Sequence, residues 1–169
     1  NMKTIKKVNL LFVIAISLLG AFTNSLNAQK ITKNFATFTS DCVVEFDIAP
    51  TCAWHDINIR PASGGNDKNT RILLRDAGKI QLFNSKEIAS NFKYKVDGTK
   101  YNFRVSLYFK DLKIPLVTVE AKEAFSKKWT VLFERSTQIS KLPVGMLEVL
   151  GKNTSKLHLT KVKAHKMET

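Results

Sequence analysis

The two cysteines, Cys42 and Cys52, stand in the segment SDCVVEFDIAPTCAWHDINIRP, with His55 and Asp56 close behind the second. Two thiols and an imidazole at this spacing suit three chemistries: a zinc site, a Cys–His nucleophile or a disulfide. Structural zinc takes four ligands in closely spaced pairs, and this segment has no CxxC pair. A nucleophile needs a free thiolate. A bend at Pro50 would bring the two Cα atoms within the ~4.4–6.8 Å that a disulfide spans. We therefore predict a Cys42–Cys52 disulfide, with free buried thiols as the alternative.

The N-terminal segment supports this prediction because it indicates export. Lysines open the segment, an apolar run follows at residues 10–19, and Leu26 and Ala28 suit the positions just before a cleavage site. These are the three parts of a secretory signal peptide, and the apolar run is shorter than the ~20 residues that span a bilayer. We expect residues 1–28 to be a cleaved signal peptide of bacterial type, with a retained anchor as the alternative. The remainder, residues 29–169, would be one domain, secreted or periplasmic, where thiols pair.

Carboxylates and imidazoles offer little further chemistry. Glu45 and Asp47 are two apart on an expected strand, so both project from one face, as the acids of a glycoside hydrolase would. Such neighbours usually face water together, and we expect a solvated face. His55 and Asp56 should point to opposite faces, which excludes a dyad and places His55 beside two core isoleucines. The chain has no GxSxG, HExxH, P-loop or dinucleotide motif. We expect no catalytic residue, no metal and no cofactor.

The elements that would carry these residues are strands. Alternating apolar and polar residues, rich in β-branched and aromatic types, recur between turn signals. The expected strands are CVVEFDI, CAWHDINI, TRILLRD, KIQLF, PLVTVEAK, WTVLFER and KLHLTKVKA, while VGMLEVL suits a strand or a short helix. Helix is otherwise confined to SKEIAS and AKEAFSKK, each two turns or less. Eight to ten short strands predict an all-β fold with minor helices, a single-domain antiparallel β-sandwich or barrel.

The segment NFKYKVDGTKYNFRVSLYF carries the strongest local signal, because Asp97-Gly98 is a favoured two-residue hairpin turn. Pairing about this turn sets Lys95 opposite Lys100, a mildly repulsive pair that a bound anion would relieve. By strand parity, Arg104 and Tyr108 share that face, and a guanidinium beside a phenol can stack against a sugar ring or a base. The predicted binding residues are Lys93, Lys95, Lys100, Arg104 and Tyr108; the alternative is an ordinary solvated face.

Charge is unevenly distributed along the chain. The formal net charge is +13, and residues 86–169 hold seventeen basic and eight acidic residues, whereas residues 30–85 hold seven and six. A basic second half favours an acidic partner: an anionic glycan, a lipid head group or an acidic protein, with nucleic acid the weaker candidate. Lysines on strand faces also simply keep strand edges from pairing with other chains.

These observations favour an exported, non-catalytic β-domain that binds an anionic or carbohydrate partner through its basic second half. Two alternatives stay open. One is a small secreted hydrolase that uses acidic residues or His55. The other is a structural or assembly protein of the cell envelope, in which the lysines serve only as a contact surface.

Overall fold

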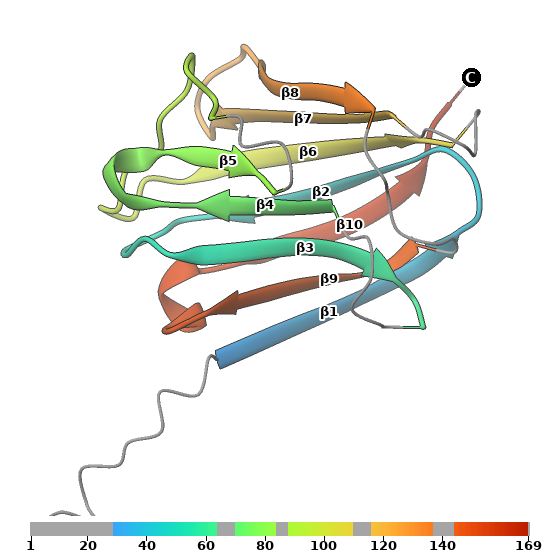
Figure 1. Ribbon diagram of the computed structural model, residues 1–169, viewed down its shortest axis with the longest axis horizontal. Coiled ribbons are helices and arrows are strands. Elements are labelled where there is room, and N and C mark those ends of the chain that lie inside the picture. Colours follow the sequence, from blue (N-terminus) through green and yellow to red (C-terminus); the bar gives the residue numbers. More distant parts are fainter. Residues whose placement is uncertain (1–28, 64–69, 84–87, 110–115, 137–143, 169) are drawn as a thin grey trace, which may run out of the picture.

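The computed structural model describes residues 29–63, 70–83, 88–109, 116–136 and 144–168. The predicted signal peptide, residues 1–28, lies outside the described residues. Within the described part, the chain forms ten strands in two antiparallel sheets that pack as two layers (Figure 1). This confirms the expected all-β sandwich. No helix among the described residues is long and apolar enough to cross a membrane.

One layer, here called the β3 sheet, runs in the order β1-β9-β3-β4-β5. Its strands are β1 (Gln29–Phe38), β9 (Val144–Gly151), β3 (His55–Pro61), β4 (Thr70–Leu74) and β5 (Ile80–Leu82). The other layer, the β6 sheet, runs in the order β10-β2-β6-β7-β8. Its strands are β10 (Thr160–Lys166), β2 (Cys42–Ile48), β6 (Tyr101–Tyr108), β7 (Leu116–Glu123) and β8 (Thr130–Ser136). Two short 3₁₀ helices, η1 (Asp76–Gly78) and η2 (Thr154–Leu157), connect strands.

The core forms where the alternating apolar positions of the two sheets meet. On β2, for example, Val44, Phe46 and Ile48 are at most 1% exposed, while Glu45 between them points outward. Phe46 faces Phe103 of β6 in the strand register, and their rings stack at 5.4 Å between centroids. Burial of such side chains from water supplies the main favourable free energy of folding. The same alternation leaves every second side chain of these strands on the outer face of its sheet.

The predicted disulfide is wrong. Cys42 opens β2 and Cys52 follows the end of that strand, and both thiols are free. A seven-residue strand at ~3.3 Å per residue separates its ends by roughly 20 Å, far beyond the reach of a disulfide. The segment around Pro50 crosses between the sheets, since β2 and β3 belong to different layers. Cys42 is a core residue, and burial raises the pKa of its thiol to about 12.

The predicted hairpin about Asp97-Gly98 is also wrong, although the chain bends at these residues. Gly98 takes the left-handed φ of +84°, and its N–H donates to the carbonyl oxygen of Pro50 at 3.0 Å. The arm before the turn is not a strand, because β6 is already paired with β2 on one side and β7 on the other. Tyr94 packs against η1 instead, donating its N–H to the Gly78 carbonyl at 3.2 Å. The pairing of β6 with β2 and β7 has therefore overridden a strong local signal.

Three further elements complete the comparison. The segment VGMLEVL forms β9, which settles the choice between strand and helix in favour of the strand. AKEAFSKK is not helical, because β7 continues through its first residues and a turn follows. β1 was not expected, since its side chains show little alternation and most are exposed. It adds to the edge of the β3 sheet by pairing with β9.

Candidate functional site

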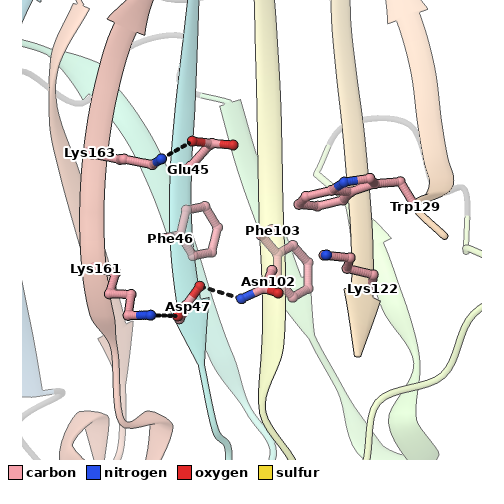
Figure 2. Close-up of a pocket in the computed structure, with 9 residues that line it drawn as sticks. All are labelled: Glu45, Phe46, Asp47, Asn102, Phe103, Lys122, Trp129, Lys161 and Lys163. Atoms are coloured by element: carbon pink, nitrogen blue, oxygen red, sulfur yellow. Dashed lines mark hydrogen bonds and ion pairs between the residues drawn. The ribbon is translucent and has the colours of Figure 1, made fainter. Parts of the chain in front are cut away.

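The outer face of the β6 sheet carries the candidate site. A depression of about 250 Å³ opens there across β10, β2, β6 and the strands beyond. Figure 2 shows how these side chains lie around it. Its lining combines one indole with carboxylates, an amide and ammonium groups: Glu45, Phe46, Asp47, Asn102, Phe103, Lys122, Trp129, Lys161 and Lys163. This set is called the Trp129 depression below.

The indole of Trp129 forms one wall and lies against two cations. The Arg104 guanidinium carbon is 4.4 Å from the ring centroid, and the Lys122 ammonium is 5.1 Å from it. Two hydrogen bonds to Glu120, of 2.7 and 2.9 Å, fix Arg104 in turn. The bond to Glu120 raises the pKa of Arg104 above its ordinary value, so the guanidinium stays charged. Cation–π contact with a guanidinium held in this way orients the indole before any ligand arrives.

Asp47 lies at the opposite wall of the depression and contacts three polar side chains there. Its Oδ1 accepts a hydrogen bond of 2.6 Å from the Asn102 amide, and its Oδ2 lies 3.5 Å from the Lys100 ammonium and 3.7 Å from that of Lys161. Glu45 pairs with Lys163 at 2.8 Å, a hydrogen bond that raises the pKa of Lys163. Glu45 and Asp47 do share a face, as predicted. That face is not simply solvated, however, since Asp47 is only 7% exposed.

A β-bulge in β10 places one of these lysines. Thr160 pairs with Asp47 and Lys163 with Glu45, so β10 uses one residue more than β2 over the same interval. Lys161, inside the bulge, has a φ of +52°, which is uncommon for a residue with a side chain. Bulges re-aim side chains and often lie beside functional sites. Here the bulge accompanies a Lys161 ammonium directed at Asp47 (Figure 2).

The five predicted binding residues do not form one patch. The Lys95 ammonium lies 3.9 Å from a Glu123 carboxylate oxygen, and the Lys100 ammonium lies 3.5 Å from an Asp47 oxygen. Each lysine therefore has an acidic neighbour, in place of the predicted repulsive pairing. Lys93 lies on the irregular segment before β6, near Gly78. Two of the five contact residues that line the Trp129 depression: Arg104 lies against Trp129, and Lys100 lies beside Asp47. Tyr108 shares the outer face of β6 with Arg104 but stands at the strand's last position.

Sequence reasoning missed the residue that defines the site. Trp129 immediately precedes β8 and follows the turn after β7, a place where an aromatic side chain reaches over the neighbouring strand. The available signal was strand parity. β7 alternates buried Val119 and Ala121 with Glu120 and Lys122, which marks the latter two as outward. Parity on β6 marks Asn102 and Arg104 in the same way. What parity cannot give is the order of the strands that brings these four side chains together.

His55 and Asp56 point to opposite faces, as predicted. His55 is fully buried, and its Nε2 donates to the Asn153 carbonyl oxygen at 3.0 Å. Because Nε2 carries the proton, it cannot act as a base toward the Cys52 thiol 3.9 Å away. Asp56 instead pairs with Arg75 at 2.8 Å on the outer face. Within the described residues no group of three His, Cys, Asp or Glu side chains could hold a metal ion.

No protein-family model and no curated protein matches the sequence. Among solved structures, the chain is similar to a sialidase, with a TM-score of 0.52 and 12% identity over 72% of this chain and 10% of the sialidase. It is also similar to sheep galectin-11 in complex with glycerol, with a TM-score of 0.46 and 13% identity over 81% of this chain and 98% of the galectin.

A third similar structure is the PL-14 alginate lyase of the marine Aplysia kurodai, with a TM-score of 0.49 and 7% identity over 83% of both chains. The chain thus spans about a tenth of the length of the sialidase that it matches. At these identities the likeness to the sialidase shows a shared fold alone. It is consistent with the β-sandwich described above and assigns no activity to this chain.

Proposed function

We propose that this protein is a carbohydrate-binding β-sandwich module, with the Trp129 depression as its site. One observation carries the proposal: the Trp129 indole is held by Arg104 and Lys122 at the edge of a depression whose other wall is polar. A sugar ring has an apolar face of C–H bonds and an edge of hydroxyl groups. The indole suits the apolar face, since a large, rigid aromatic side chain supplies contact area at little cost in entropy.

The polar wall suits hydroxyl groups. A hydroxyl both donates and accepts hydrogen bonds. Asn102 offers an amide, Glu45 offers acceptors, and the Lys161 and Lys163 ammonium groups offer donors. The volume of about 250 Å³ lies just below the ~300–1,000 Å³ of pockets for drug-sized ligands. This size fits one sugar ring, with the rest of a chain of sugars lying along the sheet face.

Local charge favours a neutral sugar at this site over the other partners suggested by composition. The lysines of β10 face carboxylates of β2, with Lys163 against Glu45 and Lys161 against Asp47. Arg104 is likewise committed to Glu120. A polyanion such as nucleic acid would have to approach these carboxylates and break these pairs. The same pairing supports binding without catalysis, because both β2 carboxylates already hold an ammonium partner.

We further propose that the module acts outside the cytoplasm, on the basis of the signal-peptide pattern in residues 1–28. Expression of the whole gene in a bacterial host tests this proposal. Mass spectrometry of the exported protein should find Gln29 as the first residue. Protein that stays inside the cell with residues 1–28 attached would contradict it.

The binding proposal is tested with Trp129→Ala and a matched control. Phe125 lies in the same turn between β7 and β8 and is fully exposed, so Phe125→Ala removes a nearby aromatic side chain outside the depression. A glycan array identifies a neutral oligosaccharide that binds, and calorimetry measures its affinity. Loss of one stacking platform should weaken binding about tenfold or more in Trp129→Ala. Trp129→Phe should retain part of the affinity, and Phe125→Ala all of it.

Equal affinities for Trp129→Ala and Phe125→Ala would contradict the assignment of the site. An array on which no neutral oligosaccharide binds would contradict carbohydrate binding at this face altogether. Circular dichroism of each variant ensures that the comparison is made between folded proteins.

A further inference from the structure

A second tryptophan, Trp54, is presented at the surface by a strained backbone. Its φ is +66°, a left-handed value that bulky residues rarely adopt. Its N–H donates to the Leu74 carbonyl oxygen at 3.0 Å, and its indole N–H donates to Asp76 at 2.9 Å. The side chain nevertheless remains 54% exposed. Backbone strain of this kind persists only where the surroundings enforce it, and it gathers at functional sites.

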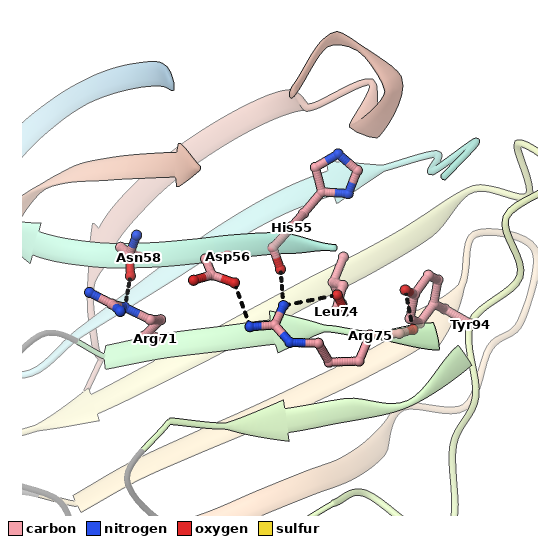
Figure 3. Close-up of polar contacts among 7 residues, drawn as sticks. All are labelled: His55, Asp56, Asn58, Arg71, Leu74, Arg75 and Tyr94. Atoms are coloured by element: carbon pink, nitrogen blue, oxygen red, sulfur yellow. Dashed lines mark hydrogen bonds and ion pairs between the residues drawn. The ribbon is translucent and has the colours of Figure 1, made fainter. Parts of the chain in front are cut away.

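Arg75 lies against the indole of Trp54 and is itself held in place. Its guanidinium carbon lies 4.9 Å from the Trp54 ring centroid. Figure 3 shows the guanidinium fixed on its other sides by Asp56 at 2.8 Å and by the carbonyl oxygens of Leu74 and His55 at 3.1 and 3.3 Å. The Trp54 indole is therefore as firmly oriented as that of Trp129, which also lies against an arginine held by a carboxylate.

The exposed indole borders a depression of about 370 Å³ at the β4–β5 side of the β3 sheet, called the Trp54 groove. Its lining is Trp54, Arg75, Asp76, Lys79, Gln81 and Ile88. Trp54 and Ile88, which is 47% exposed, supply apolar surface. In the described part of the chain, neither the Lys79 ammonium nor the Gln81 side-chain amide has an interaction partner. The groove thus contains an uncommitted cation, whereas Lys161 and Lys163 in the Trp129 depression face carboxylates.

We infer that the Trp54 groove is a second ligand site, which binds a carboxylate-bearing sugar such as a uronate or a sialate. The apolar face of the sugar ring would lie on the Trp54 indole, and its carboxylate would take the Lys79 ammonium. The Gln81 amide would bond a hydroxyl group of the same ring. Each contact matches a group that the groove leaves free, and a neutral sugar would leave the Lys79 charge unused.

This inference goes beyond the proposed function, because it concerns other residues, another sheet and another class of sugar. The two sites have no lining residue in common.

The chain has two tryptophans, so their indole N–H signals in a nitrogen–proton NMR spectrum report the two sites separately. Trp54→Phe and Trp129→Phe assign the signals. The whole ¹⁵N-labelled protein is titrated with two acidic probes, hyaluronan tetrasaccharide and sialyllactose, and with two neutral probes, cellotetraose and lactose. We expect at least one acidic probe to shift the Trp54 signal and both neutral probes to leave it in place.

Lys79→Ala should then weaken the acidic probe's affinity at Trp54 about tenfold, as expected for loss of a charged hydrogen bond. Lys128→Ala, which removes an exposed lysine from the turn between β7 and β8, is the matched control and should change nothing. A Trp54 signal that ignores both acidic probes, or that moves equally with neutral ones, overturns the inference. So does an equal affinity of Lys79→Ala and Lys128→Ala. Failure of neutral sugars to bind at Trp129 would be read from the other signal, and would count against the proposed function alone.

Discussion

Glu148 is a buried carboxylate on the outer face of the β3 sheet. Its replacement tests how much its ion pairs contribute to the stability of the fold. Its side chain is 3% exposed and accepts from Arg60 at 2.6 Å, while its other oxygen lies 2.6 Å from the Lys30 ammonium. Loss of one partner of a buried ion pair costs ~3–5 kcal/mol. Glu148→Gln keeps the shape and one acceptor, and Lys30 is half exposed, so we expect about 2–3 kcal/mol. For a domain of this size that corresponds to a fall in Tm of roughly 5–10 °C.

The pKa of Glu148 determines how the effect of Glu148→Gln on stability changes with pH. Burial alone would raise the pKa of Glu148, but hydrogen bonds from Lys30 and Arg60 outweigh it and hold the pKa below its ordinary value of 4.5. The unfolded chain therefore binds this proton more tightly than the folded protein does. The stabilisation is complete above the unfolded pKa and is lost as the pH falls through the lower, folded pKa. The gap in Tm between the natural protein and Glu148→Gln should be constant above about pH 6 and should shrink below about pH 4.5.

Differential scanning calorimetry from about pH 3 to pH 8 measures this gap. Lys30→Met, which removes the exposed member of the cluster, is the control and should cost less than about 1 kcal/mol. A gap near pH 7 smaller than about 2 °C would show that Glu148 contributes little. A gap of the same size at about pH 3 and pH 7 would show that its charge is not the cause.

Two further predictions concern the cysteines and the turns. Thiol titration of the unfolded protein should find both Cys42 and Cys52 free, and in the folded protein Cys52 should react first, because burial raises the pKa of Cys42 to about 12. A reductant should then leave Tm unchanged. Gly78→Ala should cost about 3 kcal/mol and Gly98→Ala only about 1, measured by urea denaturation. Both glycines have positive φ, but an added Cβ would lie 2.3 Å from the Tyr94 carbonyl oxygen at Gly78 and 3.8 Å from its nearest neighbour at Gly98.

Strand parity predicted the local features of the fold correctly. It placed Glu45 with Asp47 and separated His55 from Asp56. These features depend on the two-residue repeat of a strand, which is a property of neighbours in sequence.

The two pairings inferred from short spacing were wrong for one physical reason. Both Cys42–Cys52 and the arms of the Asp97-Gly98 hairpin required consecutive segments to lie side by side. In the sandwich, β2 is flanked by β10 and β6, and β6 by β2 and β7. β10 and β6 are both distant from β2 in sequence, and β6 pairs with β2 and with the strand that follows it, β7, which leaves no place for the segment before the turn. Turn chemistry fixes the direction of the chain at a turn, but it does not fix which strand its arms join.

The distribution of charge along the sequence has the same limit, because it does not give which charged residues the fold brings together. Among the described residues, two lysines of the basic second half are paired with carboxylates of the balanced half. β10, from that half, lies against β2 from the balanced half, so Lys163 meets Glu45 and Lys161 meets Asp47. Each of the two depressions is lined by one tryptophan. Each tryptophan lies against an arginine that a carboxylate of a neighbouring strand holds. Because such an assembly exists only once strands are paired, the ligand sites follow from sheet order rather than from composition.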